Sequence, residues 1–302
     1  MRRRVRSSRK AYRMLALAAL GIGLLVSGCG PQYVVLHPKG PVGQSELHLM
    51  EFAAIAMAVI ILVVFVLFGI AVVRFRDYPG NPNPYTPHWH SHKWLETLWF
   101  IIPAVILAVI AVPTVNVTYA LAKLPPTKDP VVINVTSLNW KWLFEYPNQK
   151  VATVNYLYIP VGKPVLFHLT ADSPMNTFWV PSLGGMEYTM PGRVLPLWLE
   201  ASKPGVYWGH SGQFSGIDFE KMFFHVHAVT ESKFTAWTHR LRSSAPPMTL
   251  AAYHQLLRFN TVGSESYSSF PASTWPSVSH GFTLSGGMYL LKSNNPNPTA
   301  QH

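Results

Sequence analysis

Two long apolar runs constrain this chain more than any other feature of its sequence. Residues 51–73 read EFAAIAMAVIILVVFVLFGIAVV, and residues 94–115 form a second run that is interrupted only by Pro103 and Pro113. At 1.5 Å per residue, either run is long enough to cross a hydrocarbon core about 30 Å thick as a helix. The sequence therefore predicts a transmembrane helical hairpin over residues 51–118.

The basic residues are concentrated at the N-terminus. No acidic residue precedes Glu46, and the chain begins with seven of its 24 basic residues: Arg2, Arg3, Arg4, Arg6, Arg9, Lys10 and Arg13. An apolar run over 14–26 follows them, which is typical of a secretory signal peptide, here residues 1–28. Its removal lowers the formal charge from +11 to about +4, which gives no reason to expect a nucleic-acid partner.

The signal peptide ends in VSGC, and Cys29 is the only cysteine of the chain. This ending resembles the bacterial lipobox, in which the cysteine is lipidated and becomes the new N-terminus. The alternative is an uncleaved anchor helix with an incidental cysteine, although a run of about 13 residues is short for a span. An acylated Cys29 would leave no thiol for a disulfide, a thiolate metal site or a nucleophile.

The distribution of charge around the hairpin predicts its orientation. The connector carries Arg74, Arg76 and Lys93, whereas residues 30–50 carry only Lys39. Because positive charges favour the cytoplasmic side, we expect the connector inside, with the N-terminal segment 29–50 and everything after the hairpin outside. The expected location is a bacterial cell membrane, with membrane lipid as one partner.

After residue 118 the sequence changes to short runs rich in Val, Ile, Phe, Tyr and Trp, separated by Pro and Gly. Such runs at roughly ten-residue spacing predict an antiparallel sandwich or Greek-key barrel over residues 119–231. An aromatic-rich C-terminal extension, 232–302, contains one helical candidate, LAAYHQLLRF, and ends in ten residues that we expect to be disordered.

Three segments then resemble subunit II of the haem-copper respiratory oxidases. They are WLETLWFIIP at 94–103, LNWKWLFEYP at 138–147 and TFWVPSLGGMEYTMPGR at 177–193, in the order of that family. The resemblance covers about residues 29–229. It implies a mixed fold, a two-helix transmembrane hairpin followed by an external cupredoxin-like Greek-key β-sandwich.

In the cytochrome c oxidases of this family, the β domain holds a dinuclear copper centre. Its loop pattern, C-x-E-x-C-x-x-x-H-x-x-M after Y-x-G, and an upstream histidine fall here on Ser211, Gln213, Ser215, Phe219, Met222 and Asn176. Only Met222 matches. Serine hydroxyls cannot replace the two thiolates that bridge a pair of soft copper ions, so the sequence predicts a copper loop without its metal.

The loss of these ligands is characteristic of the quinol oxidases of the family, and VVLHPKGPVG at 34–43 resembles the start of their mature subunit II. The resemblance implies subunit II of a proton-pumping complex that oxidises quinol and reduces O2 to water. Haems and copper are expected in subunit I, and this chain would bind no cofactor of its own. Subunit I, other oxidase subunits and quinol are the expected partners, and cytochrome c is not.

Glu96 lies at the expected cytoplasmic start of the second apolar run and is the candidate residue for proton transfer. A carboxylate is costly there unless it meets water or a polar partner, so it is either an interfacial residue or, as the resemblance implies, part of a proton entry.

The three histidines of the segment HWHSH (88–92) are more consistent with a patch at the membrane interface than with a metal site. Trp140 and Trp142 match positions linked to electron entry in copper-bearing relatives, and here we expect packing or contact with subunit I.

Two other interpretations remain open. The first is a membrane-tethered copper-binding or oxidase-assembly protein that uses His210, Met222, His225 and His227. The second is a subunit that accepts electrons from a soluble protein through a non-standard site. His225 and His227 share one face if they lie on a strand, which is the pattern that the first of these interpretations needs.

Overall fold

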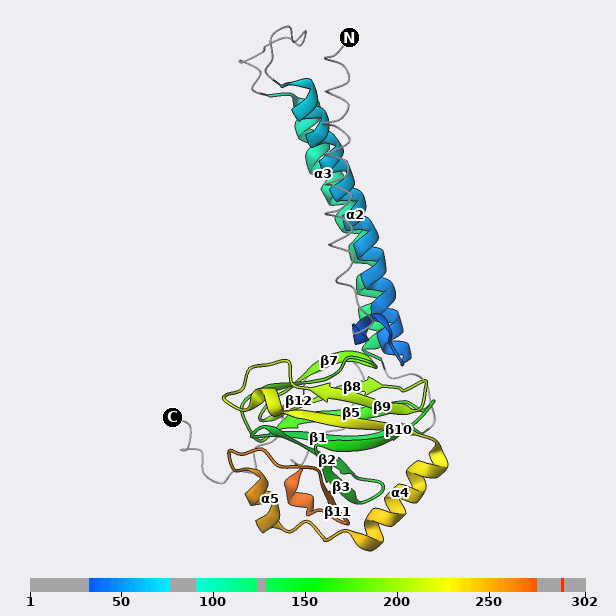
Figure 1. Ribbon diagram of the computed structural model, residues 1–302, viewed down its shortest axis with the longest axis vertical. Coiled ribbons are helices and arrows are strands. Elements are labelled where there is room, and N and C mark those ends of the chain that lie inside the picture. The colour runs from blue at the N-terminus through cyan, green and yellow to red at the C-terminus, as the bar shows by residue number, and fades with distance from the viewer. Residues whose placement is uncertain (1–32, 77–90, 124–128, 276–288, 291–302) are drawn as a thin grey trace, which may run out of the picture. The chain divides into compact units, whose positions relative to one another are not determined.

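The computed structural model describes residues 33–76, 91–123, 129–275 and 289–290. Within these residues, two helices are long and apolar enough to cross a membrane, α2 (Pro41–Arg74) and α3 (Lys93–Leu121) (Figure 1). Their apolar side chains are largely exposed, as expected of helices that face lipid or other membrane helices. The helix α3 continues through both of its prolines. The signal peptide, Cys29, His88 and His90 lie outside the described residues.

The segment that follows the hairpin is a β-sandwich of two mixed sheets. One sheet has the strand order β11-β3-β2-β1-β5-β8-β12, and the other has the order β4-β10-β9-β6-β7. The strands are β1 (Val131–Leu138), β2 (Lys141–Tyr146), β3 (Val151–Val154), β4 (Tyr156–Pro160), β5 (Val165–Ala171), β6 (Asn176–Val180), β7 (Gly184–Thr189), β8 (Arg193–Leu199), β9 (Gly205–His210), β10 (Phe223–Val229), β11 (Glu265–Tyr267) and β12 (Tyr289–Leu290).

The predicted sandwich is present, but its strands are not all antiparallel as expected. The strand β5 pairs in parallel with β1, and β4 pairs in parallel with β10. Between β1 and β5 the chain crosses to the other sheet at β4 and then returns. A strand that comes back after such a crossover can lie parallel to its neighbour, whereas a tight hairpin forces the antiparallel arrangement. The transmembrane hairpin followed by a β-sandwich is confirmed.

Aromatic side chains fill the space between the two sheets. Trp142, Phe144, Phe178 and Phe224 are fully buried, and the rings of Phe178 and Phe224 stack with centroids 4.9 Å apart. Gly209 faces this cluster, where a Cβ atom would lie 2.1 Å from the Phe224 ring. The glycine of the Y-x-G motif is therefore required by packing in the core.

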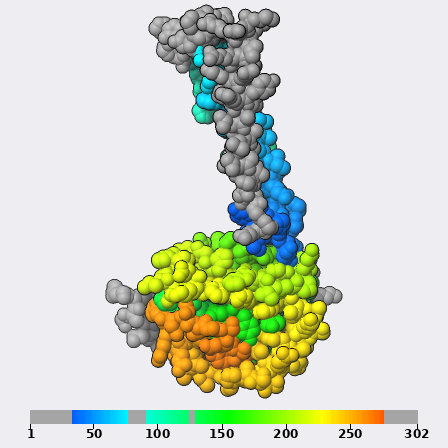
Figure 2. Space-filling model, viewed as in Figure 1, coloured from blue at the N-terminus to red at the C-terminus, as the bar shows by residue number. Residues whose placement is uncertain are grey.

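The described part of the C-terminal extension up to residue 275 is folded and packs on the β domain. It contains α4 (Glu231–Ser244), α5 (Leu250–Leu256), β11 and the short 3-10 helix η3 (Ala272–Thr274). The predicted helix in LAAYHQLLRF is confirmed as α5, whereas α4 was not predicted. The strand β11 pairs with β3, and buried side chains of the extension pack on strands β1 to β3 in a second apolar cluster. Figure 2 shows the part of the extension after α4, in orange, beside the yellow α4 and next to the green strands.

Two ionisable side chains are buried under this extension. The ammonium group of Lys141 donates to the carbonyl oxygens of Leu256 and Arg258 and to Oδ1 of Asn260, at 2.8–2.9 Å. A carboxylate oxygen of Glu145 accepts a hydrogen bond from the Thr274 hydroxyl. These bonds hold the extension to the outer face of β2.

The first turns of α2 contact the loop that precedes β7 and the first residues of β7. Gly43 N–H donates to the Leu183 carbonyl at 2.9 Å, and Gly185 N–H donates to the Glu46 carboxylate at 3.0 Å. A Cβ atom on Gly184 would lie 2.4 Å from the Gly43 nitrogen. The V-P-S-L-G-G stretch therefore packs against the start of α2 with the two backbones in direct contact, and this contact connects the hairpin to the β domain.

Candidate functional site

The residues at the expected copper positions come from two places in the sandwich. Asn176 begins β6, and Ser211 to Met222 form the loop between β9 and β10, which contains the 3-10 helix η2 (Phe219–Lys221). Because β6 and β9 are neighbours in one sheet, Asn176 and Ser211 come into contact. The structure thus brings these two residues together in the place where the family pattern puts its ligands.

Ser211 and Asn176 form hydrogen bonds with each other and with nearby backbone groups. The Ser211 hydroxyl lies 3.1 Å from Oδ1 of Asn176 and 3.2 Å from the Gln213 carbonyl, either of which accepts its proton. It accepts from the Gln213 backbone N–H at 3.3 Å, and the Asn176 amide donates to the Pro174 carbonyl at 3.0 Å. Both side chains are buried, so these bonds replace water and hold the start of the loop.

Met222, the one matching ligand position, belongs to the apolar core. It is 1% exposed, and its backbone carbonyl accepts from Ser211 N–H at 3.3 Å and from Nε1 of Trp142 at 3.4 Å. Trp142 itself is fully buried, which agrees with the packing role expected for it. The thioether is therefore held by core packing at the end of the loop.

Ser215 and Phe219 lie in a different environment, among aromatic rings. The Ser215 carbonyl accepts from Nε1 of Trp140 at 3.1 Å, and the Phe219 ring meets Phe214 edge-on at 5.0 Å. Gly216 has φ +118°, and a Cβ atom there would lie 3.0 Å from the Trp140 ring. This half of the loop is shaped by its contact with Trp140.

The side chains at these positions do not fit a dinuclear copper centre. Two thiolates and imidazole nitrogens are replaced by hydroxyl, amide and phenyl groups, and only one soft donor remains. Within the described residues there is no group of three or more His, Cys, Asp or Glu that could hold a metal ion. The conformation of the loop is stabilised by hydrogen bonds and core packing, neither of which requires a metal.

The other histidines considered for metal binding are engaged with aromatic rings. His227 stacks on Tyr158 at 4.6 Å with an interplanar angle of 12°, and His225 meets Trp208 at 4.6 Å. The centroids of the two imidazole rings are 6.5 Å apart. Burial, and to a smaller extent His225, lowers the pKa of His227.

Glu96 caps the second membrane helix. One of its carboxylate oxygens accepts from the His92 backbone N–H at 3.2 Å, and Nδ1 of His92 accepts from the Leu95 N–H at 3.4 Å. These reciprocal bonds are a variant of the capping box, with the glutamate one residue further into the helix. This capping role was not predicted from the sequence, although His92 four residues before Glu96 could have indicated it.

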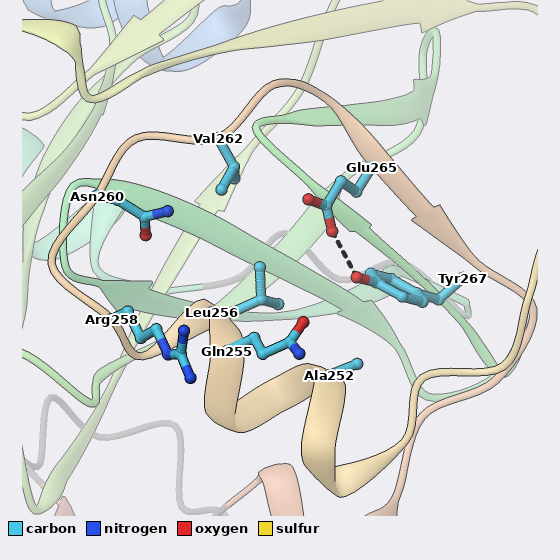
Figure 3. Close-up of a pocket in the computed structure, with 8 residues that line it drawn as sticks. All are labelled: Ala252, Gln255, Leu256, Arg258, Asn260, Val262, Glu265 and Tyr267. Carbon is cyan, nitrogen blue, oxygen red and sulfur yellow. Dashed lines mark hydrogen bonds between the residues drawn. The ribbon is translucent and has the colours of Figure 1, made fainter.

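A separate pocket of about 330 Å³ lies within the C-terminal extension, between α5 and β11 (Figure 3). Its polar side chains include Gln255, Arg258, Asn260 and Glu265, and the hydroxyl of Tyr267 donates to the Glu265 carboxylate. Asn260 also accepts from the buried Lys141. The pocket thus adjoins the bonds that fasten the extension to β2, and no sequence motif pointed to it.

Comparison with known proteins identifies the family. The family described as cytochrome c oxidase subunit II, transmembrane domain, matches residues 40–117, and the periplasmic domain of the same subunit matches residues 145–229. Quinol oxidase subunit 2 of Bacillus cereus is 42% identical over 261 residues, which cover 85% of this chain and 90% of the relative. The protein of the same name from Bacillus subtilis is 39% identical over 260 residues, 85% of this chain and 81% of the relative.

A solved structure is also similar, the periplasmic domain of subunit II of cytochrome oxidase from Bradyrhizobium japonicum. It is 22% identical and covers 38% of this chain and 94% of that domain, with a TM-score of 0.37. The two family matches cover most of the hairpin and the sandwich strands from the end of β2 to β10, and the Bacillus relatives extend over most of the chain. The chain therefore belongs to the subunit II family of the haem-copper oxidases, with relatives that are quinol oxidase subunits.

Proposed function

We propose that this chain is the copper-free subunit II of a complex that oxidises two quinols and reduces one O2 to two molecules of water. The observation that carries the proposal is the contact of Ser211 with Asn176, which takes the place of copper ligands in a chain whose relatives are quinol oxidase subunits. Without a copper relay, electrons from a membrane-dissolved quinol would pass directly to a haem in a partner subunit.

This chain would then support the subunit that carries the redox centres. Haems and copper belong, in this proposal, to subunit I, and the chain contributes membrane helices and an external domain. The exposed apolar side chains of α2 and α3 suit contact with both lipid and the helices of that partner. Cytochrome c is not expected as a donor, because the site that would receive its electrons is absent from the loop.

A second part of the proposal is that Glu96 takes part in proton entry on the cytoplasmic side. Its carboxylate is half-buried at the first turn of α3, where it accepts one backbone hydrogen bond. Within the described residues, the other carboxylate oxygen has no hydrogen bond from the chain, so it could accept a proton from water. Capping and proton transfer are compatible, because a neutral carboxyl group can still accept the His92 N–H bond.

Export and lipidation complete the proposed function. The expected signal peptide 1–28 and a diacylglyceryl group on Cys29 would place the N-terminus on the outer surface of a bacterial cell membrane. The β domain would lie on the same side, which agrees with the basic connector between the two spans. The lipid would be a second anchor beside the hairpin.

The test is to purify the complex through a tag on this chain and to measure its donor specificity and metal content. We expect quinol-dependent O2 consumption, no oxidation of reduced cytochrome c, and haem in the complex. Copper bound stoichiometrically by the chain itself, with no oxidase subunit co-purifying, would overturn the proposal and favour a copper-binding or assembly protein.

A further inference from the structure

The C-terminal extension contains a cavity between α5 and β11, lined by residues within 252–267 (Figure 3). Its volume is about 330 Å³. Sites for small molecules usually measure roughly 300–1,000 Å³, so this cavity lies at the lower end of that range. We call it the extension pocket, and its size selects a small ligand.

A buried lysine holds one wall of the extension pocket in place. Lys141 is 0% exposed. Its ammonium group donates to the carbonyl oxygens of Leu256 and Arg258 and to Oδ1 of Asn260, and all three acceptor residues line the pocket. Burying an ammonium group is costly unless its N–H groups are all bonded, and here the three acceptors use all three of them. A charged side chain thus lies in the interior of the domain, where it fixes the shape of the pocket.

Two asparagines of the sandwich fix the same wall. Nδ2 of Asn139, between β1 and β2, donates to the Leu257 carbonyl at 2.6 Å. Nδ2 of Asn155, between β3 and β4, donates to the Val262 carbonyl at 2.8 Å. The loop between α5 and β11 is therefore bonded to three side chains of the sandwich. A preformed wall of this kind loses less conformational entropy when a ligand binds than a free loop would.

Charged side chains of opposite sign lie on opposite sides of the pocket. Figure 3 shows Arg258 on the side of the loop and Glu265 on the side of β11, with Leu256 between them. The hydroxyl of Tyr267 donates to the Glu265 carboxylate, which orients that carboxylate. Among the described residues, Arg258 forms no salt bridge. The pocket therefore offers a cationic group and an anionic group that are not paired with each other.

This distribution of charge suits a ligand that carries one anionic and one cationic group. A guanidinium group can bind a carboxylate through two parallel N–H bonds, and a carboxylate such as that of Glu265 can accept from a primary ammonium group. A ligand with only a negative charge would be repelled by Glu265, and one with only a positive charge would be repelled by Arg258. Lys141 has no N–H group left for a ligand, because its three bonds lie within the protein.

We propose that the extension pocket binds a small zwitterion, with the carboxylate of the ligand on Arg258 and its ammonium group on Glu265. Free amino acids are the class of molecule with this chemistry. The amide groups of Gln255 and Asn260 also line the pocket and supply further donors and acceptors. The site does not require the oxidase complex, because all of its residues belong to the extension and to the sandwich that holds it.

The experiment is isothermal titration calorimetry of the purified full chain in detergent. The probes are three zwitterions of increasing charge separation, glycine, 4-aminobutyrate and 6-aminohexanoate, and the controls are butyrate and n-butylamine, which carry one charge each. We expect at least one zwitterion to bind, and both controls to bind at least tenfold more weakly than that zwitterion. Failure of all three zwitterions to bind at millimolar concentration would overturn the inference, as would equally tight binding of either control.

A second measurement assigns the binding to the pocket. We expect Arg258→Gln and Glu265→Gln each to weaken binding of the zwitterion at least tenfold, because each removes one of the two charges, with the thermal unfolding of the β domain unchanged in the absence of ligand. The matched controls are Arg242→Gln on α4 and Glu220→Gln on η2, both exposed and outside the pocket, and they should leave the affinity unchanged. If the two pocket variants bind the zwitterion as tightly as the parent, the ligand binds elsewhere and the inference is refuted.

Discussion

Replacing Glu145 with glutamine tests how the C-terminal extension is held. The side chain is fully buried on β2, one of its oxygens accepts from Thr274, and the other has no hydrogen-bond partner within the described residues. Burial raises the pKa of Glu145 from 4.5 to about 7. At neutral pH the folded protein therefore holds a carboxyl group that is partly protonated, whereas the same group is ionised in the unfolded chain.

The sign and size of the effect follow from this difference. A carboxyl that binds its proton more tightly when folded stabilises the fold fully below pH 4.5 and loses that contribution as the pH rises through 7. The gap between the two pKa values corresponds to about 3 kcal/mol. Glutamine keeps an oxygen that can accept the Thr274 hydrogen bond but cannot ionise. Glu145→Gln should therefore remove the loss of unfolding free energy that accompanies ionisation at higher pH.

The assay is denaturant unfolding of the β domain in the full chain, followed by tryptophan fluorescence between pH 4 and 8. His168 titrates in the opposite sense, because burial lowers its pKa to about 4, so only the difference between variant and parent isolates Glu145. We expect the variant's advantage in free energy of unfolding to grow by about 3 kcal/mol from pH 4 to 8. Any constant cost of the buried amide shifts this curve without changing its shape.

A surface carboxylate provides the control. Glu220 is exposed on η2, so Glu220→Gln should change stability by less than about 0.5 kcal/mol at every pH. If the difference curve for Glu145→Gln is flat, the buried carboxyl does not titrate as proposed, and the attachment of the extension depends on other contacts.

Four further predictions concern separate parts of the chain. Glu96→Gln should slow quinol oxidation per haem without loss of assembly, because it keeps the capping oxygen and removes the acid; unchanged turnover would leave Glu96 as a cap alone. Lys141→Met should cost about 3 kcal/mol of unfolding free energy, since three acceptors lose their donor; chemical denaturation measures it. Gly209→Ala should lower stability by about 2 kcal/mol or more, because its Cβ meets the Phe224 ring, and a thermal scan that matches the parent would contradict this. Intact-mass analysis should show a mature chain that begins at Cys29 with added diacylglyceryl mass, which Cys29→Ser abolishes.

The sequence by itself determined the parts whose signals are local. A helix that crosses a bilayer satisfies its own backbone hydrogen bonds and needs only a long apolar run, so composition was enough for α2 and α3. Strand-forming runs between Pro and Gly likewise indicated the sandwich. The missing cysteines alone excluded a thiolate copper site in the loop, because the chemistry of a ligand depends on its residue type.

Only the tertiary structure decided how distant segments meet. The parallel pairing of β1 with β5, the cover that α5 and β11 give to one sheet, and the contact of Ser211 with Asn176 all join residues far apart in the sequence. Helix α4 lies in polar sequence and is stabilised by the burial of a few side chains such as Trp237 against the sandwich. Such contacts depend on non-local packing, and no periodicity within one segment encodes their partner.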